Sequence, residues 1–174
     1  DEQQMAKMSI DYCFVPDEAG EELKILNMKV KPEGLLFPTA VASKGVEDPF
    51  GAEMVKQALE RTGHKEVILK NDNENALEAV AKKVRAESAL KIVPEKSIEG
   101  DSQTNGDIEQ CNDYVRGKVR TLIDYAAEQY GVKIGAKHPL TQFAPRFVGF
   151  LHNRFVEGAD GKTGYERLKG KKFK

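Results

Sequence analysis

Three acidic residues of this chain stand where carboxylates could bind divalent metal ions. Asp11 lies inside an apolar run, Asp72 follows a short apolar segment, and Glu109 lies near the start of a long helical pattern. A carboxylate inside a buried strand is costly unless something pairs with it. Carboxylates gathered in one place repel each other, and their hard oxygen atoms suit Mg²⁺ or Mn²⁺. Two such ions, about 4 Å apart, could activate an attacking oxygen and stabilise a leaving oxygen in phosphoryl transfer.

Each acid also has an ordinary structural explanation when it is taken alone. Asp11 could be a satisfied polar group of a strand, Asp72 a turn residue, and Glu109 a carboxylate that complements a helix dipole. The elements around them help to decide. If the strand that holds Asp11 and the strand before Asp72 are neighbours, both carboxylates reach one sheet edge, where ligands of open α/β sheets gather.

The hydrophobic pattern predicts an α/β fold with a mixed five-stranded sheet, three antiparallel strands followed by two that pair in parallel, flanked by helices. The strands are expected at residues 5–15, 23–30, 35–43, 66–70 and 91–93. The helices are expected at residues 49–61, 74–84, 107–130 and 140–155. Pro38 favours an edge or bulge in the third strand, and Asn73 is the expected N-cap of the second helix.

The composition is that of one globular domain. The chain has 174 residues, is 40% hydrophobic and carries a net charge of −1, with no apolar run near the ~20 residues that cross a bilayer. The near-neutral charge argues against strong stand-alone nucleic-acid binding, so partners or added domains must supply much of any DNA affinity. Cys13 and Cys111 are expected to be buried thiols of a reducing compartment, and the histidines lack the spacing of a metal site.

The three acids and their neighbours resemble the Asp, Asp, Glu motif of retroviral and retrotransposon integrase catalytic cores. The matching segments are residues 10–12 (IDY), 70–74 (KNDNE) and 102–109 (SQTNGDIE). Between Asp72 and Glu109 lie 36 residues, one more than is usual among retroviral members. Residues 150–155 (FLHNRF) and 161–167 (GKTGYER) are similar to the region that follows the core in retrotransposon polyproteins, so the resemblance covers roughly residues 5–170.

The resemblance implies an RNase H-like fold and a DNA integrase, a polynucleotidyl transferase with endonuclease activity. Asp11, Asp72 and Glu109 would be both the catalytic residues and the ligands of two Mg²⁺ or Mn²⁺ ions. The implied reactions are 3′-end processing of element DNA and strand transfer of the new 3′-hydroxyl into target DNA. Glycines 100 and 106 bound a polar loop before the long helix.

The same resemblance assigns residues for DNA contact and for loop movement. Asn105 matches the mobile loop that touches DNA ends, and Gly100 and Gly106 would be the hinges of that loop. Arg116 matches a basic DNA-contact position, and Arg120 lies on the same ridge of the helix. A solvated helix face is an equal alternative for these two arginines.

Two departures from the family pattern leave other functions open. Asp113 stands where the family often has a lysine, and Gln110 replaces a common arginine, and both changes weaken DNA contact along this helix. One alternative function is an RNase H-like nuclease that cleaves without joining. Another is an integrase-derived DNA-binding or assembly module with a vestigial site.

The domain organisation and partners follow from the same comparison. Residues 1–156 are expected to form the catalytic core, and 157–174 a basic, Gly/Lys-rich extension that is extended or partly disordered. The chain begins with Asp1, as a processed product would, and flanking domains are expected to complete the activity. The expected partners are element and target DNA and a second copy, in a homodimer or larger assembly, with no membrane. Synthesis within a cytoplasmic polyprotein and action in the nucleus are implied.

Overall fold

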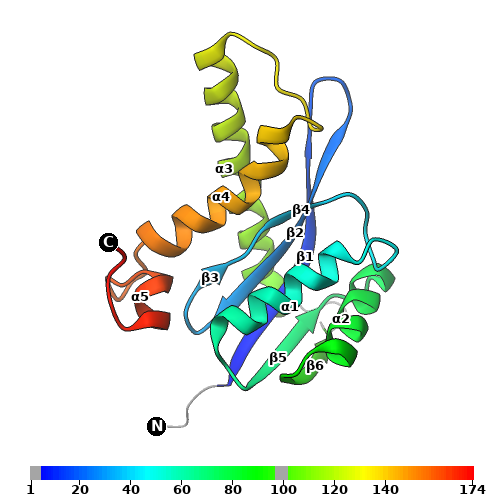
Figure 1. Ribbon diagram of the computed structural model, residues 1–174, viewed down its shortest axis with the longest axis vertical. Coiled ribbons are helices and arrows are strands. Elements are labelled where there is room, and N and C mark those ends of the chain that lie inside the picture. The colour runs from blue at the N-terminus through cyan, green and yellow to red at the C-terminus, as the bar shows by residue number, and fades with distance from the viewer. Residues whose placement is uncertain (1–4, 97–101) are drawn as a thin grey trace.

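The computed structural model describes residues 5–96 and 102–174, with the backbone alone at 102–104. Its strands are β1 (Ala6–Pro16), β2 (Glu22–Lys31), β3 (Leu35–Leu36), β4 (Thr39–Val41), β5 (Glu66–Asn71) and β6 (Lys91–Lys96). Its helices are α1 (Phe50–Thr62), α2 (Asn75–Glu87), α3 (Ser102–Tyr130), α4 (Pro139–Phe155) and α5 (Gly164–Lys169). Figure 1 shows α1 and α2 in front of the sheet and α3 passing behind it.

The sheet is mixed, which confirms the predicted fold class. Its strand order is β3-β2-β1-β5-β6, and β4 also pairs with β2. The β1–β2, β2–β3 and β2–β4 pairs are antiparallel, whereas β1–β5 and β5–β6 are parallel. The sheet has six strands rather than five because the third predicted strand is divided at Phe37 and Pro38. Pro38 lacks the backbone N–H that a continuous ladder requires.

The sheet separates two apolar cores. Met8, Ile10 and Tyr12 of β1 pack with the apolar stripes of α1 and α2. On the opposite face, Cys13 and Val15 pack with α3 and α4. The period-2 alternation of a strand produces this division.

The helix ends agree with the sequence at most positions. Gly63 follows α1 and Gly131 follows α3, and both glycines have positive φ angles, as expected of residues that end helices. The prediction of Asn73 as an N-cap was wrong, because Glu74 occupies that position and its side chain makes no capping hydrogen bond. Cys13 and Cys111 are buried free thiols, as predicted, and burial raises the pKa of Cys111 to about 12.

Helix α3 begins earlier than its sequence suggests. It starts at Ser102, so Gly106 lies inside the helix rather than at the end of a loop, and Gly100 lies outside the described residues. Glu109 is therefore two turns into α3 and not in its first turn. No helix in the described part of the chain combines the length and the apolarity that a membrane span needs.

Asp107 anchors the first turns of α3 to strand β2. Its carboxylate forms an ion pair with Lys29 at 3.7 Å and accepts a hydrogen bond from Lys31. The hydrogen bond from Lys31 lowers the pKa of Asp107 below its ordinary value, and Lys29 lowers this pKa further. These contacts fix α3 against the sheet at the end where the candidate acids lie.

The C-terminal segment is folded, so the expectation of an extended or disordered tail was wrong. α5 begins with a capping box in which Thr163 and Glu166 each bond the backbone N–H of the other. Arg167 then donates to the carbonyl oxygen of Glu33 at 2.8 Å, which holds α5 against the β2–β3 turn. The boundary at residue 156 stays a prediction.

Two helical glycines give opposite expectations for the same substitution. A Cβ at Gly149 would lie 2.6 Å from Pro38 Cδ and 3.0 Å from the Leu36 carbonyl oxygen, whereas one at Gly117 would meet nothing within 4 Å. Gly149→Ala is therefore expected to destabilise the fold by about 1–3 kcal/mol through overpacking. Gly117→Ala should stabilise it by about 0.5–1 kcal/mol. Urea denaturation of both variants measures the difference, and equal shifts would contradict this packing of α4.

The Asp107 ion pairs predict a pH-dependent loss of stability in Asp107→Asn. Because the folded-state pKa is lowered, the ion pairs stabilise the fold above the unfolded-state pKa of about 4 and lose this effect as pH falls through the lower folded value. The variant should be less stable than the wild type at pH 7, by less than about 1 kcal/mol since the pairs are partly exposed, and this gap should close toward pH 2. Urea denaturation across this range tests it, with exposed Asp124→Asn on α3 as the control. A gap that widens in acid would refute the assignment.

Candidate active site

The sheet register brings Asp11 and Asp72 to the same place. In the parallel β1–β5 pair, Ile10 lies opposite Asn71, so the two aspartates are the next residues along neighbouring strands. β1 is the longer strand and continues past Asp11, whereas β5 ends at Asn71. Asp72 therefore stands at the carboxyl end of β5, beside the middle of β1. β1 and β5 are therefore neighbours, which is the arrangement expected to bring both carboxylates to one sheet edge.

Asp11 lies in a half-buried position, and both of its carboxylate oxygens accept hydrogen bonds. Oδ1 accepts from the backbone N–H of Tyr12 at 2.8 Å, and Oδ2 accepts from Asn112 Nδ2 of α3 at 2.8 Å. Burial raises the pKa of Asp11, and the nearby carboxylates of Asp72 and Glu74 raise it further. The two hydrogen bonds act in the opposite direction, because they favour the charged form.

The four residues predicted nearest to the chemistry line one small pocket. Asp11, Asp72, Asn105 and Glu109 surround a volume of about 30 Å³, together with Lys70 and others from β1, β5 and α3. Asp72 and Glu109 are exposed, and Oδ1 of Asp72 accepts from the backbone N–H of Asn73 at 2.8 Å. The structure thus brings these residues together, and their catalytic roles stay predictions.

The acids of the pocket suit a hard divalent cation in their chemistry and location. Each oxygen of Asp11 accepts one protein hydrogen bond and keeps a second lone pair for another partner. Within residues 5–96 and 102–174, however, no three acidic, histidine or cysteine side chains form a preformed metal-binding group. Asp72 and Glu109 are exposed, so packing does not confine their side chains to one rotamer.

The two predicted DNA-contact arginines lie outside this pocket. Arg116 is half-buried and its Nη1 donates to Asp113 at 3.2 Å, while Arg120 is exposed farther along α3. Asp113 is therefore the ion-pair partner of Arg116. This pairing reduces the positive charge that Arg116 offers to a phosphate.

The sequence analysis missed a pair of buried asparagines beside Asp11. Asn112 lies between Cys111 and Val115 in what reads as the apolar stripe of α3, and it is 7% exposed. Its Oδ1 accepts from Nδ2 of Asn27, a β2 residue with no exposed surface, at 2.7 Å. The available signal was a polar residue at an apolar position in each element, and the two positions meet in space.

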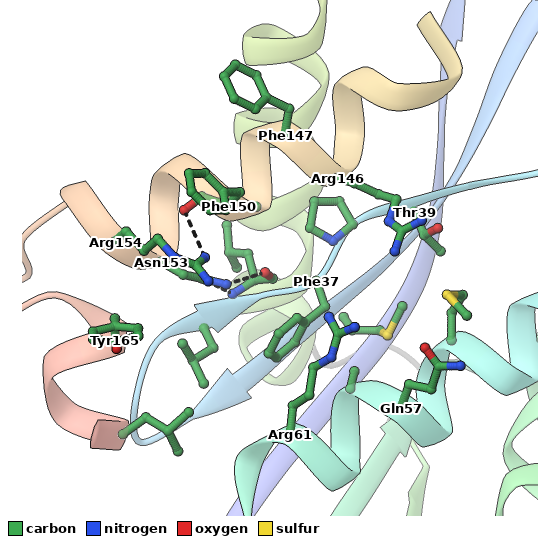
Figure 2. A pocket seen from close by; sticks show the side chains of 18 of the residues that line it. Phe37, Thr39, Gln57, Arg61, Arg146, Phe147, Phe150, Asn153, Arg154 and Tyr165 are labelled. Carbon is green, nitrogen blue, oxygen red and sulfur yellow. Dashed lines mark hydrogen bonds between the residues drawn. The ribbon is translucent and has the colours of Figure 1, made fainter. Parts of the chain in front are cut away.

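A separate, larger groove lies between α1, the β3–β4 edge and α4. It encloses about 940 Å³, and Figure 2 shows the side chains that line it, from Arg61 of α1 to Phe150 of α4. Three phenylalanines of α4 form a stacked row, with ring centroids 5.7 Å apart for Phe143 and Phe147 and 6.3 Å apart for Phe147 and Phe150. Arg154 covers Phe150, with its guanidinium carbon 4.0 Å from the ring centroid.

No protein-family model matches the sequence, and curated protein sequences give no match. Solved structures do match. The catalytic core domain of BIV integrase aligns with a TM-score of 0.63 at 15% identity, over 93% of this chain and 92% of that chain. The HTLV-2 integrase catalytic core domain in complex with magnesium, in a trimeric form, gives 0.62 at 14% identity, over 93% and 95%.

A third match is a larger assembly. A chain of the simian T-cell lymphotropic virus intasome, in complex with PP2A regulatory subunit B56 gamma, gives a TM-score of 0.71 at 10% identity. This match covers 97% of the present chain and 55% of the intasome chain. At such identities the likeness is one of fold, and it confirms the RNase H-like architecture that the motif implied. The chain therefore has the fold of retroviral integrase catalytic cores.

Proposed function

We propose that the chain is the catalytic core of an integrase-type polynucleotidyl transferase, which processes the 3′ ends of element DNA and joins them to target DNA. One observation carries the proposal: Asp11, Asp72 and Glu109, far apart in sequence, line one pocket at the edge where β5 ends. They do so in a fold shared with retroviral integrase cores. Among the described residues, no histidine or cysteine lines this pocket to supply a different chemistry.

Two Mg²⁺ or Mn²⁺ ions are the proposed cofactors, held by Asp11, Asp72 and Glu109. When bound, such ions acidify an attacking oxygen, stabilise a leaving oxygen and neutralise phosphate charge. The HTLV-2 relative was solved in complex with magnesium. The chain's own residues orient the reaction: Asp11 is fixed by its two hydrogen bonds, and Asn105 lies at the pocket wall where a DNA end would enter.

DNA contact outside the pocket is assigned to Arg116 and Arg120 of α3. Because Arg116 is paired with Asp113, much of the DNA affinity would come from other domains or subunits. The proposed activity places the protein in the nucleus, after synthesis within a cytoplasmic polyprotein.

A second candidate function is a DNA-binding or assembly module with a vestigial site. One observation favours it: Asp113 forms an ion pair with Arg116, which reduces the positive charge available for DNA. An RNase H-like nuclease would use the same pocket for cleavage alone. The three functions differ in their products, so one assay separates them.

A second copy of the chain is the proposed partner at the α1–α4 groove. Phe143 is 56% exposed and Phe150 40% exposed, and contiguous apolar surface of this kind marks protein interfaces. The HTLV-2 cores were solved in dimeric and trimeric forms. Figure 2 shows Phe147 and Phe150 of α4 among the side chains that line this groove.

Asp72→Asn is expected to reduce strand joining at least about 100-fold, because an isosteric amide removes the charge that a metal ligand needs, a loss of several kcal/mol in transition-state stabilisation. The assay follows joining of pre-processed duplex ends with randomised terminal sequences to plasmid DNA in Mg²⁺ or Mn²⁺. Asp124→Asn, an exposed change on α3, is the matched control.

The wild-type products decide between the candidates. Joined product supports the integrase, cleavage without joining indicates the nuclease, and DNA binding without either indicates the module. Full joining by Asp72→Asn would exclude the proposed catalytic role of Asp72.

The double variant Phe143→Ser, Phe147→Ser is expected to weaken self-association at least about tenfold. Each phenylalanine that the interface between two copies buries would contribute about 1.5–3 kcal/mol to association. Sedimentation velocity over a concentration series measures the change. Tyr125→Ser serves as the control, since this aromatic residue is 65% exposed on α3 and lies outside the groove. An unchanged association constant for the double variant would rule out this face as the interface.

A further inference from the structure

A series of three hydrogen-bonded side chains links the interior of the sheet to the candidate active site. Asn27 of β2 donates from Nδ2 to Asn112 Oδ1 at 2.7 Å, and Asn112 donates from Nδ2 to Asp11 Oδ2 at 2.8 Å. Asn27 also lies opposite Asp11 in the β1–β2 register. Asn27 itself does not line the pocket that holds the acids.

Asn27 occupies a position where an apolar residue would be expected. It has no exposed surface, and its neighbours along β2, Leu26 and Met28, are core residues. Its second Nδ2 hydrogen is directed at Cys13 Sγ, 3.2 Å away, which is a weak acceptor. Its Oδ1 is buried with no hydrogen-bond partner among the described residues. A buried unsatisfied polar atom of this kind is costly and calls for an explanation.

The explanation lies in the asymmetry of the Asn112 amide. An amide has an acceptor end and a donor end, and only the donor end can bond a carboxylate. Because Asn27 presents an N–H, the oxygen of Asn112 turns toward it and the NH₂ group turns toward Asp11. Without the Asn27 donor, the oxygen end of the Asn112 amide loses its hydrogen bond, and Asp11 alone holds the amide. A reversed amide would place its oxygen against the Asp11 carboxylate, where two acceptors repel.

We propose that Asn27 is a positioning residue that acts through Asn112 to hold the Asp11 carboxylate in the orientation needed for divalent-cation binding. This inference rests on the proposed function, in which Asp11 is a metal ligand. Residues that orient ligands from outside the coordination shell commonly change metal affinity or activity 10–100-fold when they are replaced. The same expectation applies here to a residue that contacts neither metal nor DNA.

The test measures Mn²⁺ binding by calorimetry on the full chain. Asn27→Leu keeps a similar volume and removes the donor, and Asn27→Ala is the second variant in case the larger side chain impairs folding. Each is expected to weaken Mn²⁺ binding about tenfold and to lower kcat for strand joining about as much, with KM for DNA unchanged. In an Asn112→Ala background, adding Asn27→Leu should have no further effect, because the connection is already broken.

Val119→Ala is the matched control. Val119 is fully buried on the same face of α3, two turns beyond Asn112, so its truncation loosens the helix without touching the amides. It should lower the thermal midpoint and leave Mn²⁺ affinity unchanged. If Val119→Ala and the Asn27 variants reduce Mn²⁺ affinity alike, or if the Asn27 and Asn112 effects add, Asn27 has a structural role only and the proposal is overturned.

Crystal structures of the wild type and of Asn27→Leu separate this inference from the proposed function. A rotated Asn112 amide and a displaced Asp11 carboxylate in the variant support the positioning role. Unchanged Asp11 in the variant refutes it. A wild-type chain that binds no Mn²⁺ overturns the proposed function and the purpose assigned to Asn27, while the two structures still show whether Asn27 controls Asp11.

Discussion

The arrangement of this molecule depends on how the carboxylate of Asp11 is satisfied inside the sheet. A half-buried carboxylate must find hydrogen-bond donors, and those that face Asp11 Oδ2 come from Asn112 of helix α3. That contact fixes both the rotation of α3 and its position along the strand. The face of the sheet under α3 is divided accordingly. Toward the α3 N-terminus it is polar, with Asp11, Asn27 and Lys29, and farther along it is apolar, with Cys13 and Val15.

The apolar and polar parts of the contact between α3 and the sheet contribute differently to the fold. Val115 and Val119 are fully buried, and burial of such side chains is worth about 1.5–3 kcal/mol each, so the apolar half supplies most of the stability. A net hydrogen bond is worth about 1 kcal/mol, so the polar half adds less. The polar half instead sets the orientation of α3, because amides and carboxylates pair in only a few geometries. The apolar contacts hold α3 on the sheet, and the polar contacts determine where its first turns, and therefore Glu109, are placed.

The sequence was sufficient for the features that depend on periodicity and spacing. Alternating and helical patterns predicted the mixed sheet. The strand positions of Asp11 and Asp72, together with the resemblance of the three acids to the integrase motif, predicted a shared site. Residues 102–106 read as a loop because Ser, Thr, Asn and Gly are weak helix formers. They nevertheless form the first turn of α3, and the next residue, Asp107, is paired with Lys29 of β2. The Gly/Lys-rich tail read as disordered, although a local capping box and a long-range bond from Arg167 fold it. Asn27 and Asn112 could not be paired from sequence, because 85 positions separate them.

Under the proposed function, the three acids must share one site although their negative charges repel each other. Two carboxylates about 4 Å apart repel by roughly 4 kcal/mol at an effective dielectric constant near 20, which neutral hydrogen bonds of about 1 kcal/mol cannot offset. The raised pKa of Asp11, to which Asp72 contributes after burial, expresses the same repulsion. A cation between the acids reverses the sign of the interaction. Asp11 is held rigidly in a strand, whereas Asp72 and Glu109 are exposed and can adjust their positions to a cation. Only Asp11 therefore requires a buried amide to orient it.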